Sequence, residues 1–169
     1  AVSCEHLVEA AARHEGITYL RTTRMKTPVI YDNDESFPIG GSKVLRAGKD
    51  DRVTLIGAGA TLHEALEAAD RLKEKGVAAR VIDLYSVKPV DAETLAKAAR
   101  ETGALVVVED HYAEGGLADA VREALVDAPT PVHSLAVRRK PMSGKPEELL
   151  AFEGIDADAV VEKVQEILD

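Results

Sequence analysis

The chain has 169 residues, about the length of one typical domain, and its 46% hydrophobic and 30% charged residues are typical of a folded globular protein. Its 21 basic and 30 acidic residues give a net charge of −9, which argues against a nucleic-acid-binding surface and against docking on anionic membranes. No apolar run approaches the roughly 20 residues that cross a membrane, and the single cysteine, Cys4, excludes disulfide scaffolds and cysteine zinc sites and favours a reducing, cytoplasmic location.

The first 45 residues are less regularly patterned than the rest. Ser3 is expected to cap the first helix, and Gly16 to end it. Because the strict alternation of the later sequence is missing here, we interpret this part as the end of a different domain, joined by residues 46–51. The predicted elements are a helix over residues 3–14, strands over 17–22 and 28–31, and a polar loop over 32–41.

From residue 52 onward, strand patterns alternate with amphipathic helix patterns. This alternation predicts an α/β fold with three layers, in which a mostly parallel sheet has helices on both faces. Continuous apolar strands such as residues 105–108 suit a sheet that is covered on both sides. The predicted strands are 52–57, 79–84, 104–109 and 131–137, and the predicted helices are 61–75, 91–102, 117–126, 146–152 and 156–168.

A glycine-containing turn over residues 57–61 (GAGAT) joins a predicted strand to a predicted helix, as a phosphate-binding turn does. Asp83, near the end of the next strand, stands where a nucleotide site requires an acid for the ribose. Such a site also requires a third glycine, and Leu62 is there instead. The preferred interpretation is a tight strand–helix turn with Thr61 as the helix cap, and a nucleotide or anion site is the alternative.

His63 and Glu64 begin a sequence that is typical of a zinc-protease helix. That motif requires a second histidine at position 67, which is Glu67 in this chain. The ligand set is therefore incomplete, and no metal-ligating residues are predicted. His63 is expected to be a solvent-exposed residue in the first turn of its helix.

Glu109, Asp110 and His111 end a predicted strand, and open α/β sheets bind ligands at the carboxyl ends of their strands. Glu109 and His111 could support acid–base chemistry, but no nucleophile lies beside them in the sequence. A cluster that orders the following loop or contacts a partner chain is therefore preferred over a catalytic site.

Arg21 and Arg24 lie at the end of the predicted strand 17–22. A guanidinium can bind a phosphate or carboxylate through paired N–H groups, so either residue is a candidate anion ligand. Because side chains alternate along a strand, the two arginines point to opposite faces and at most one can be the ligand. Two ordinary surface arginines are the alternative. From these residues alone, no complete catalytic set is visible.

A set of longer segments occurs in a fixed order along the chain. The segments are GITYLRTTR, PVIY, FPIGGSKVL, RVTLIGAGATLHEAL, VIDLYSVKPVD, VVVEDHYAEGGLADAV and RRKPMSGKPEELL. Together they resemble transketolase from about residue 16 onward, and most closely the shorter, animal-type transketolases. The resemblance assigns residues 1–45 to the C-terminal tail of the pyrimidine-binding domain, 46–51 to a linker and 52–169 to the transketolase C-terminal domain.

Transketolases transfer a two-carbon ketol unit between sugar phosphates, using thiamine diphosphate and Mg²⁺ or Ca²⁺ at sites between the two subunits of a homodimer. By the resemblance, the cofactor, metal and catalytic residues all precede this chain. The chain then supplies one site residue, Arg24, which matches the family's sugar-phosphate arginine. Met25 departs from the family pattern, so the loop after Arg24 can differ, and Ala113 replaces an aromatic residue that is common in the family.

A whole transketolase subunit is much longer than this chain. The resemblance therefore implies a C-terminal fragment, or the small subunit of a split transketolase, that is inactive alone and requires the N-terminal part as its partner. We also expect a homodimer. The alternative function is a stand-alone α/β module that binds a nucleotide or anion, or that only dimerises, without catalysis.

Overall fold

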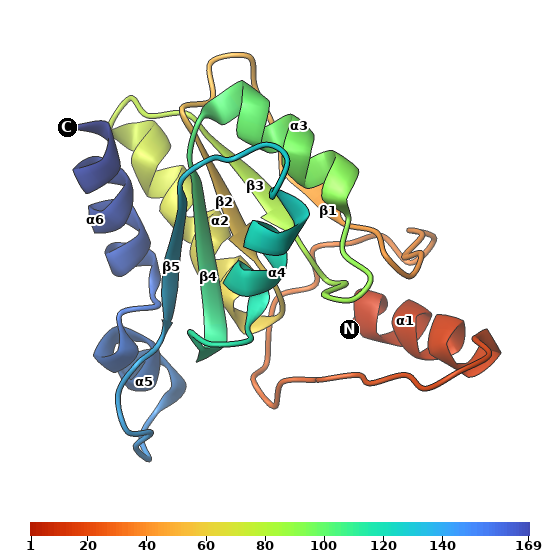
Figure 1. The fold of residues 1–169 in the computed structure, drawn as a ribbon. Helices are drawn as coiled ribbons and strands as arrows, with labels where there is room; N and C mark the ends of the chain where they lie inside the picture. Colours follow the sequence, from red (N-terminus) through yellow and green to blue (C-terminus); the bar gives the residue numbers. More distant parts are fainter.

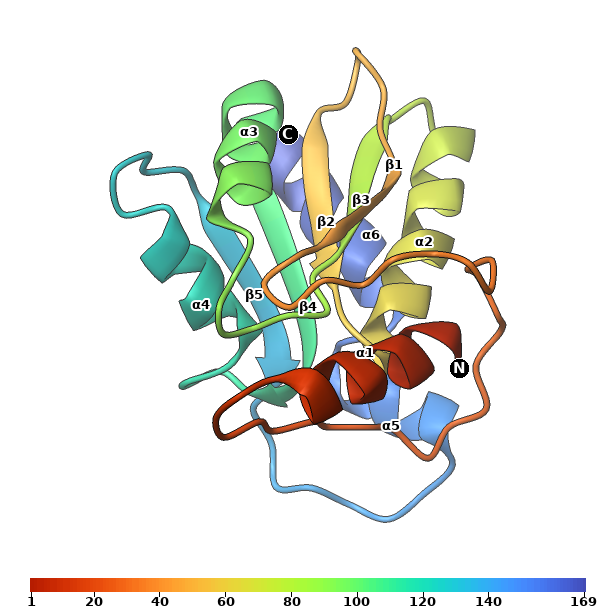
Figure 2. The same ribbon diagram turned by 90° about the vertical axis from the view of Figure 1, so that its right-hand side faces the viewer.

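A computed structural model describes all 169 residues and shows a five-stranded sheet between two layers of helices (Figure 1, Figure 2). The elements are α1 (Val2–Arg13), β1 (Lys43–Arg46), β2 (Val53–Gly57), α2 (Ala60–Glu74), β3 (Ala79–Asp83), α3 (Ala92–Thr102), β4 (Leu105–Tyr112), α4 (Leu117–Ala124), β5 (Val132–Val137), α5 (Pro146–Glu153) and α6 (Ala157–Leu168). The strand order is β1-β3-β2-β4-β5; β2 to β5 run parallel, and β1 is antiparallel at one edge. The predicted three-layer, mostly parallel α/β fold is confirmed.

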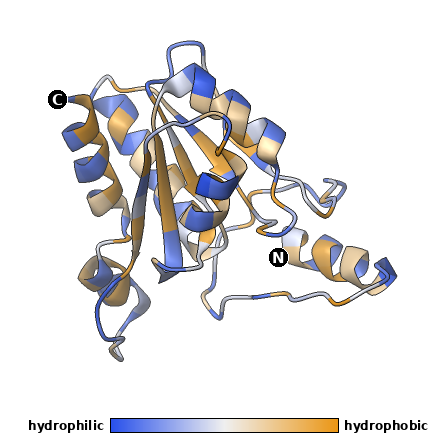
Figure 3. Ribbon diagram, viewed as in Figure 1, coloured by the Kyte–Doolittle hydropathy of each residue, from blue (hydrophilic) through white to orange (hydrophobic).

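Each face of the sheet has its own hydrophobic core. Because successive side chains of a strand point to opposite faces, Leu55 and Val106 pack with α2 and α6, whereas Ile56 and Leu105 pack with α3 and α4. The central parts of the strands are mostly apolar, while the helices carry hydrophilic residues among their apolar ones (Figure 3). Burying one large aliphatic side chain stabilises a fold by about 1.5–3 kcal/mol, so these two cores hold the domain together.

The helix ends follow local sequence signals in most places. Asp91 caps α3 by accepting a hydrogen bond from the Thr94 N–H at 3.0 Å, and Gly103 ends that helix in a left-handed conformation. The predicted cap at Ser3 was wrong, because α1 begins at Val2 and Ser3 lies inside its first turn without a capping bond. No helix is long and apolar enough to cross a lipid bilayer.

The strands predicted over 17–22 and 28–31 were wrong. Residues 14–42 contain neither helix nor strand, and Ile17 and Tyr19 are almost fully exposed. A strand requires a neighbouring strand to satisfy its N–H and C=O groups, and no segment of this chain pairs with either one. The composition of these segments favours strands, but without a pairing segment in this chain they stay irregular.

One strand was not predicted. β1 pairs with β3 in antiparallel register from Lys43 opposite Asp83, with an irregularity between Val44 and Arg46. Only four residues long and half-exposed, it lacks the apolar run that marks the central strands. The sheet therefore begins before residue 45, and the division of the chain at residues 46–51 stays a prediction.

Candidate functional site at the carboxyl edge of the sheet

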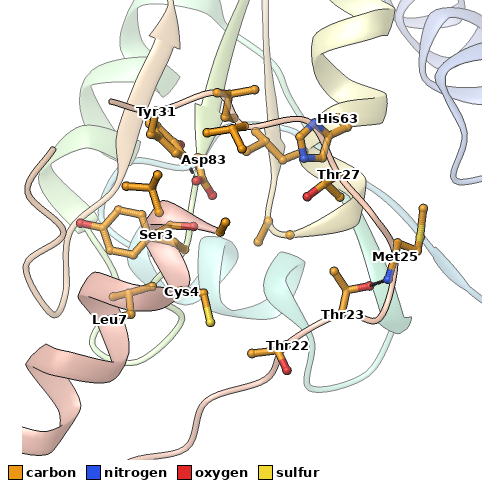
Figure 4. Close-up of a pocket in the computed structure, with 18 of the residues that line it drawn as sticks. Ser3, Cys4, Leu7, Thr22, Thr23, Met25, Thr27, Tyr31, His63 and Asp83 are labelled. Carbon is orange, nitrogen blue, oxygen red and sulfur yellow. Dashed lines mark hydrogen bonds between the residues drawn. The ribbon is translucent and has the colours of Figure 1, made fainter. Parts of the chain in front are cut away.

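A cavity of about 480 Å³ lies at the carboxyl edge of the sheet, where open α/β sheets bind ligands. Its outer wall consists of α1 and residues 20–31, which cross this edge (Figure 2). Its inner wall consists of the turn after β2, the first residues of α2, and the end of β3. Figure 4 shows the side chains that surround it. The cavity thus lies between the part of the chain that lacks strands and the sheet itself.

Asp83, the last residue of β3, is the buried acid of this cavity, with only 4% of its surface exposed. Its Oδ2 accepts a hydrogen bond from the Tyr31 hydroxyl at 2.5 Å (Figure 4), whereas its Oδ1 is buried without any partner. Burial raises the pKa of Asp83 to about 6, although the Tyr31 hydrogen bond and the Lys43 charge act in the opposite direction. Burial and the nearby Asp83 charge also raise the pKa of Tyr31, which therefore stays a donor. Asp83 therefore carries one buried carboxylate oxygen without a donor.

An aromatic cluster fixes the segment that carries Tyr31. Phe37 is 4% exposed and packs edge-on against Tyr31 and Tyr85, with ring centroids 4.9 and 5.2 Å away. The Tyr85 hydroxyl donates to the Pro38 carbonyl at 3.1 Å, and burial raises the pKa of Tyr85 to about 12. Sequence reasoning missed Tyr31, because it lies 52 positions from Asp83 and no local pattern links the two.

The turn over residues 57–61 is tight, as predicted, but its cap was assigned wrongly. A Cβ at Gly57 would lie 2.8 Å from the Leu62 Cα, so only glycine permits this approach of strand and helix. Gly59, not Thr61, precedes α2. Thr61 is buried in the helix, and its hydroxyl bonds the Val108 carbonyl at 2.7 Å, which ties α2 to β4. No side chain caps the first turn of α2.

His63 is half-buried and lines the cavity, so the expectation of a solvent-exposed residue was wrong (Figure 4). Burial lowers the pKa of His63, which favours the neutral imidazole. Glu64 points elsewhere and accepts a hydrogen bond from the Ala157 N–H at 2.9 Å, at the start of α6. The two residues therefore have separate structural surroundings.

Glu109 orders the start of α4, in agreement with the preferred interpretation of the strand-end cluster. It is 4% exposed and accepts hydrogen bonds from the N–H groups of Leu117 at 2.5 Å and Ala118 at 3.2 Å. Burial raises the pKa of Glu109, and these two bonds oppose the rise. His111 is exposed and bonds only the Tyr112 carbonyl, so Glu109 and His111 form no acid–base pair.

Arg21 and Arg24 have different surroundings. The Arg21 guanidinium donates to the Asp110 carboxylate at 3.0 Å and to the Asp110 carbonyl at 2.9 Å, which anchors the extended segment to the end of β4. Arg24 is exposed and does not line the cavity. Because residues 17–22 form no strand, alternation does not decide between the arginines. Arg21 is already occupied by Asp110, and the phosphate role of Arg24 stays a prediction.

Comparisons with known proteins all identify the same family. Residues 40–160 match the sequence model of the family described as "Transketolase, C-terminal domain". The chain is 47% identical to human transketolase and 48% identical to bovine transketolase-like protein 1, covering 99% of this chain but only 27% and 28% of those proteins. A solved structure of a split-gene transketolase, described as an inactive beta4 tetramer, superposes with a TM-score of 0.92 at 40% identity, covering 98% of this chain and 54% of that one.

Proposed function

This chain belongs to the transketolase C-terminal domain family, and we propose that it is the C-terminal part of a transketolase that transfers a two-carbon ketol unit between sugar phosphates. The observation that carries the proposal is the match to transketolases, in sequence and in fold, over nearly the whole chain. The chain spans about a quarter of the length of these curated relatives. The remaining part comes from the same polypeptide or from a separate subunit.

Residues 1–45 are proposed to be the tail of the preceding, pyrimidine-binding domain, and 46–51 the linker. Two observations support this division. The family match begins at residue 40, and residues 17–22 are extended and exposed without a neighbouring strand. An extended segment with unpaired N–H and C=O groups is a template for another strand. We assign that strand to the upstream part of the enzyme.

Thiamine diphosphate and its Mg²⁺ or Ca²⁺ supply the carbanion chemistry of ketol transfer when they are bound. The residues of this chain do not fit a diphosphate–metal site, because no three histidine, cysteine, aspartate or glutamate side chains are placed to hold a metal ion. We therefore assign the cofactor and the metal to the upstream part and derive no step through them. The active sites would form on assembly into a homodimer.

Arg24 is proposed to bind the phosphate of the sugar substrate. Its guanidinium is exposed, and its segment is held in place three residues earlier by the Arg21–Asp110 ion pair. A guanidinium donates two parallel hydrogen bonds to a phosphate, which fixes the orientation of the substrate as well as binding it. The phosphate lies far from the bond that is made, so the contact is similar in the ground state and in the transition state.

The test is the kinetics of the enzyme reconstituted from this chain and the upstream part of human transketolase. Arg24→Ala should raise KM for sugar phosphates about 10- to 150-fold, because one charge-assisted contact is lost, and should leave kcat nearly unchanged. Hydroxypyruvate, a donor without a phosphate, should be barely affected. Arg52→Ala is the matched control, since Arg52 is an exposed arginine immediately before β2, at the other end of the sheet. An unchanged KM for sugar phosphates, or an equal effect on hydroxypyruvate, would exclude the phosphate role.

A further inference from the structure

The outer wall of the cavity presents apolar side chains that nothing in this chain covers. α1 contributes Val8, and the extended segment contributes Leu20, Val29 and Ile30. These side chains line the cavity and are still 37–66% exposed. Uncovered apolar surface of this kind usually marks a place where another molecule packs.

The inner wall presents the unpartnered Oδ1 of Asp83. The three groups that shift or share its electrostatics are engaged: the Tyr31 hydroxyl donates to Oδ2, the Tyr85 hydroxyl to the Pro38 carbonyl, and the Lys43 ammonium to Glu35. A buried acceptor left without a donor destabilises the fold. A donor carried into the cavity by another polypeptide would satisfy this atom.

The position of the cavity indicates which molecule supplies that donor. One wall belongs to residues 1–31, which precede the region matched by the family and lack partners for their extended backbone. The chain covers only 27% of human transketolase, so most of the enzyme lies outside it. A polypeptide that pairs with the extended segment would reach the cavity directly behind it.

Resting on the function proposed above, we propose that an apolar segment of the upstream transketolase part inserts into this cavity and carries an N–H, ammonium or guanidinium donor to Asp83 Oδ1. The apolar outer wall supplies the area for docking, and Asp83 supplies its specificity. The buried carboxylate selects a segment that carries a donor at one position and rejects an apolar or acidic one.

The experiment measures the binding of this chain to the upstream part of human transketolase, produced as a separate polypeptide, by isothermal titration calorimetry. Asp83→Asn keeps the shape of the side chain but removes the charge, and should weaken binding about 10- to 100-fold. Thr22→Trp, at an exposed residue that lines the cavity, should weaken it similarly by filling the space. The matched controls are Asp70→Asn on α2 and Val126→Trp after α4, both exposed and away from the cavity, and they should stay within about twofold.

A pH series gives a readout that a merely structural role would not change. Asp83 faces Tyr31, Tyr85 and Lys43, and shares the cavity with His63 and the amino terminus of Ala1. Binding of the wild-type chain should strengthen as the pH rises through about 6, whereas binding of Asp83→Asn should not follow this change. All of the facing groups are retained in the variant, so their titration cannot produce the difference.

The outcomes separate this inference from the function on which it rests. If the wild-type chain does not bind the upstream part at all, the proposed function is overturned together with the inference. If the wild-type chain binds and Asp83→Asn and Thr22→Trp bind equally well, only the docking role of the cavity is overturned. If the variants change self-association of the chain in sedimentation instead, the occupant is a second copy and the inference is wrong.

Discussion

Burial of Asp83 should make the isolated chain less stable at neutral pH, and Asp83→Asn should remove this cost. The pKa of Asp83 rises from 3.8 in the unfolded chain to about 6 in the fold. The difference of about 2 units, at 1.36 kcal/mol for each, corresponds to about 3 kcal/mol. Below pH 3.8 the side chain is protonated in both states, and no cost arises. As the pH rises from 3.8 through about 6, the unfolded chain releases its proton first, so stability falls.

Urea unfolding of the wild-type chain and of Asp83→Asn at several pH values measures this cost. The difference in unfolding free energy should shift in favour of the variant by about 2 kcal/mol between about pH 4.5 and about pH 7.5. Asp70→Asn changes the same charge at an exposed position and should show no such shift. If the difference in unfolding free energy between Asp83→Asn and the wild-type chain is independent of pH, the carboxylate ionises in the fold without a cost. That result would contradict the claim that Oδ1 is buried without a partner.

Three further predictions concern the fold, the cofactor and association. Gly116→Ala should destabilise the chain by about 2–4 kcal/mol in chemical unfolding, because a Cβ there overlaps the Glu109 carboxylate that holds the start of α4, whereas Gly144→Ala has room and should change stability little. The isolated chain should not bind thiamine diphosphate in calorimetry, and saturable micromolar binding would contradict the assignment of the cofactor to the upstream part. Because apolar side chains away from the cavity, such as Val44 and Met142, are exposed, the chain should self-associate, with a two-fold dimer expected in analytical ultracentrifugation, and a strictly monomeric profile at tens of micromolar would count against an interface.

The alternating region from residue 52 onward could be predicted element by element, because each strand and helix there buries its apolar face within the same domain. The later part of β4 escaped prediction, since Asp110 to Tyr112 are polar or exposed and continue the strand by pairing with β5. Residues 17–22 failed for the opposite reason: their composition favours a strand, but a strand exists only with a neighbour. Strand propensity alone therefore does not determine whether a strand forms, because a strand also requires a neighbouring strand to pair with.

The candidate site was harder to predict, because long-range pairs define it. Asp83 and Glu109 were identified from their positions at strand ends, and both proved to be buried. The hydrogen-bond donor to Asp83 is a tyrosine 52 positions away, and the donors to Glu109 are two backbone N–H groups of the next helix. Arg21 likewise meets Asp110 across 89 positions. No spacing rule within one element encodes such contacts.

The most direct test of the central claim is a ketol-transfer assay on separately purified parts. This chain and the upstream part of human transketolase are each assayed alone, and then together with thiamine diphosphate, Mg²⁺ and sugar phosphates. We predict no activity from either part alone, and activity on mixing that saturates at equal amounts of the two. Ketol transfer by this chain alone, or a stable complex of the two parts that remains inactive with its cofactor bound, would contradict the assignment of this chain as the C-terminal part of a transketolase.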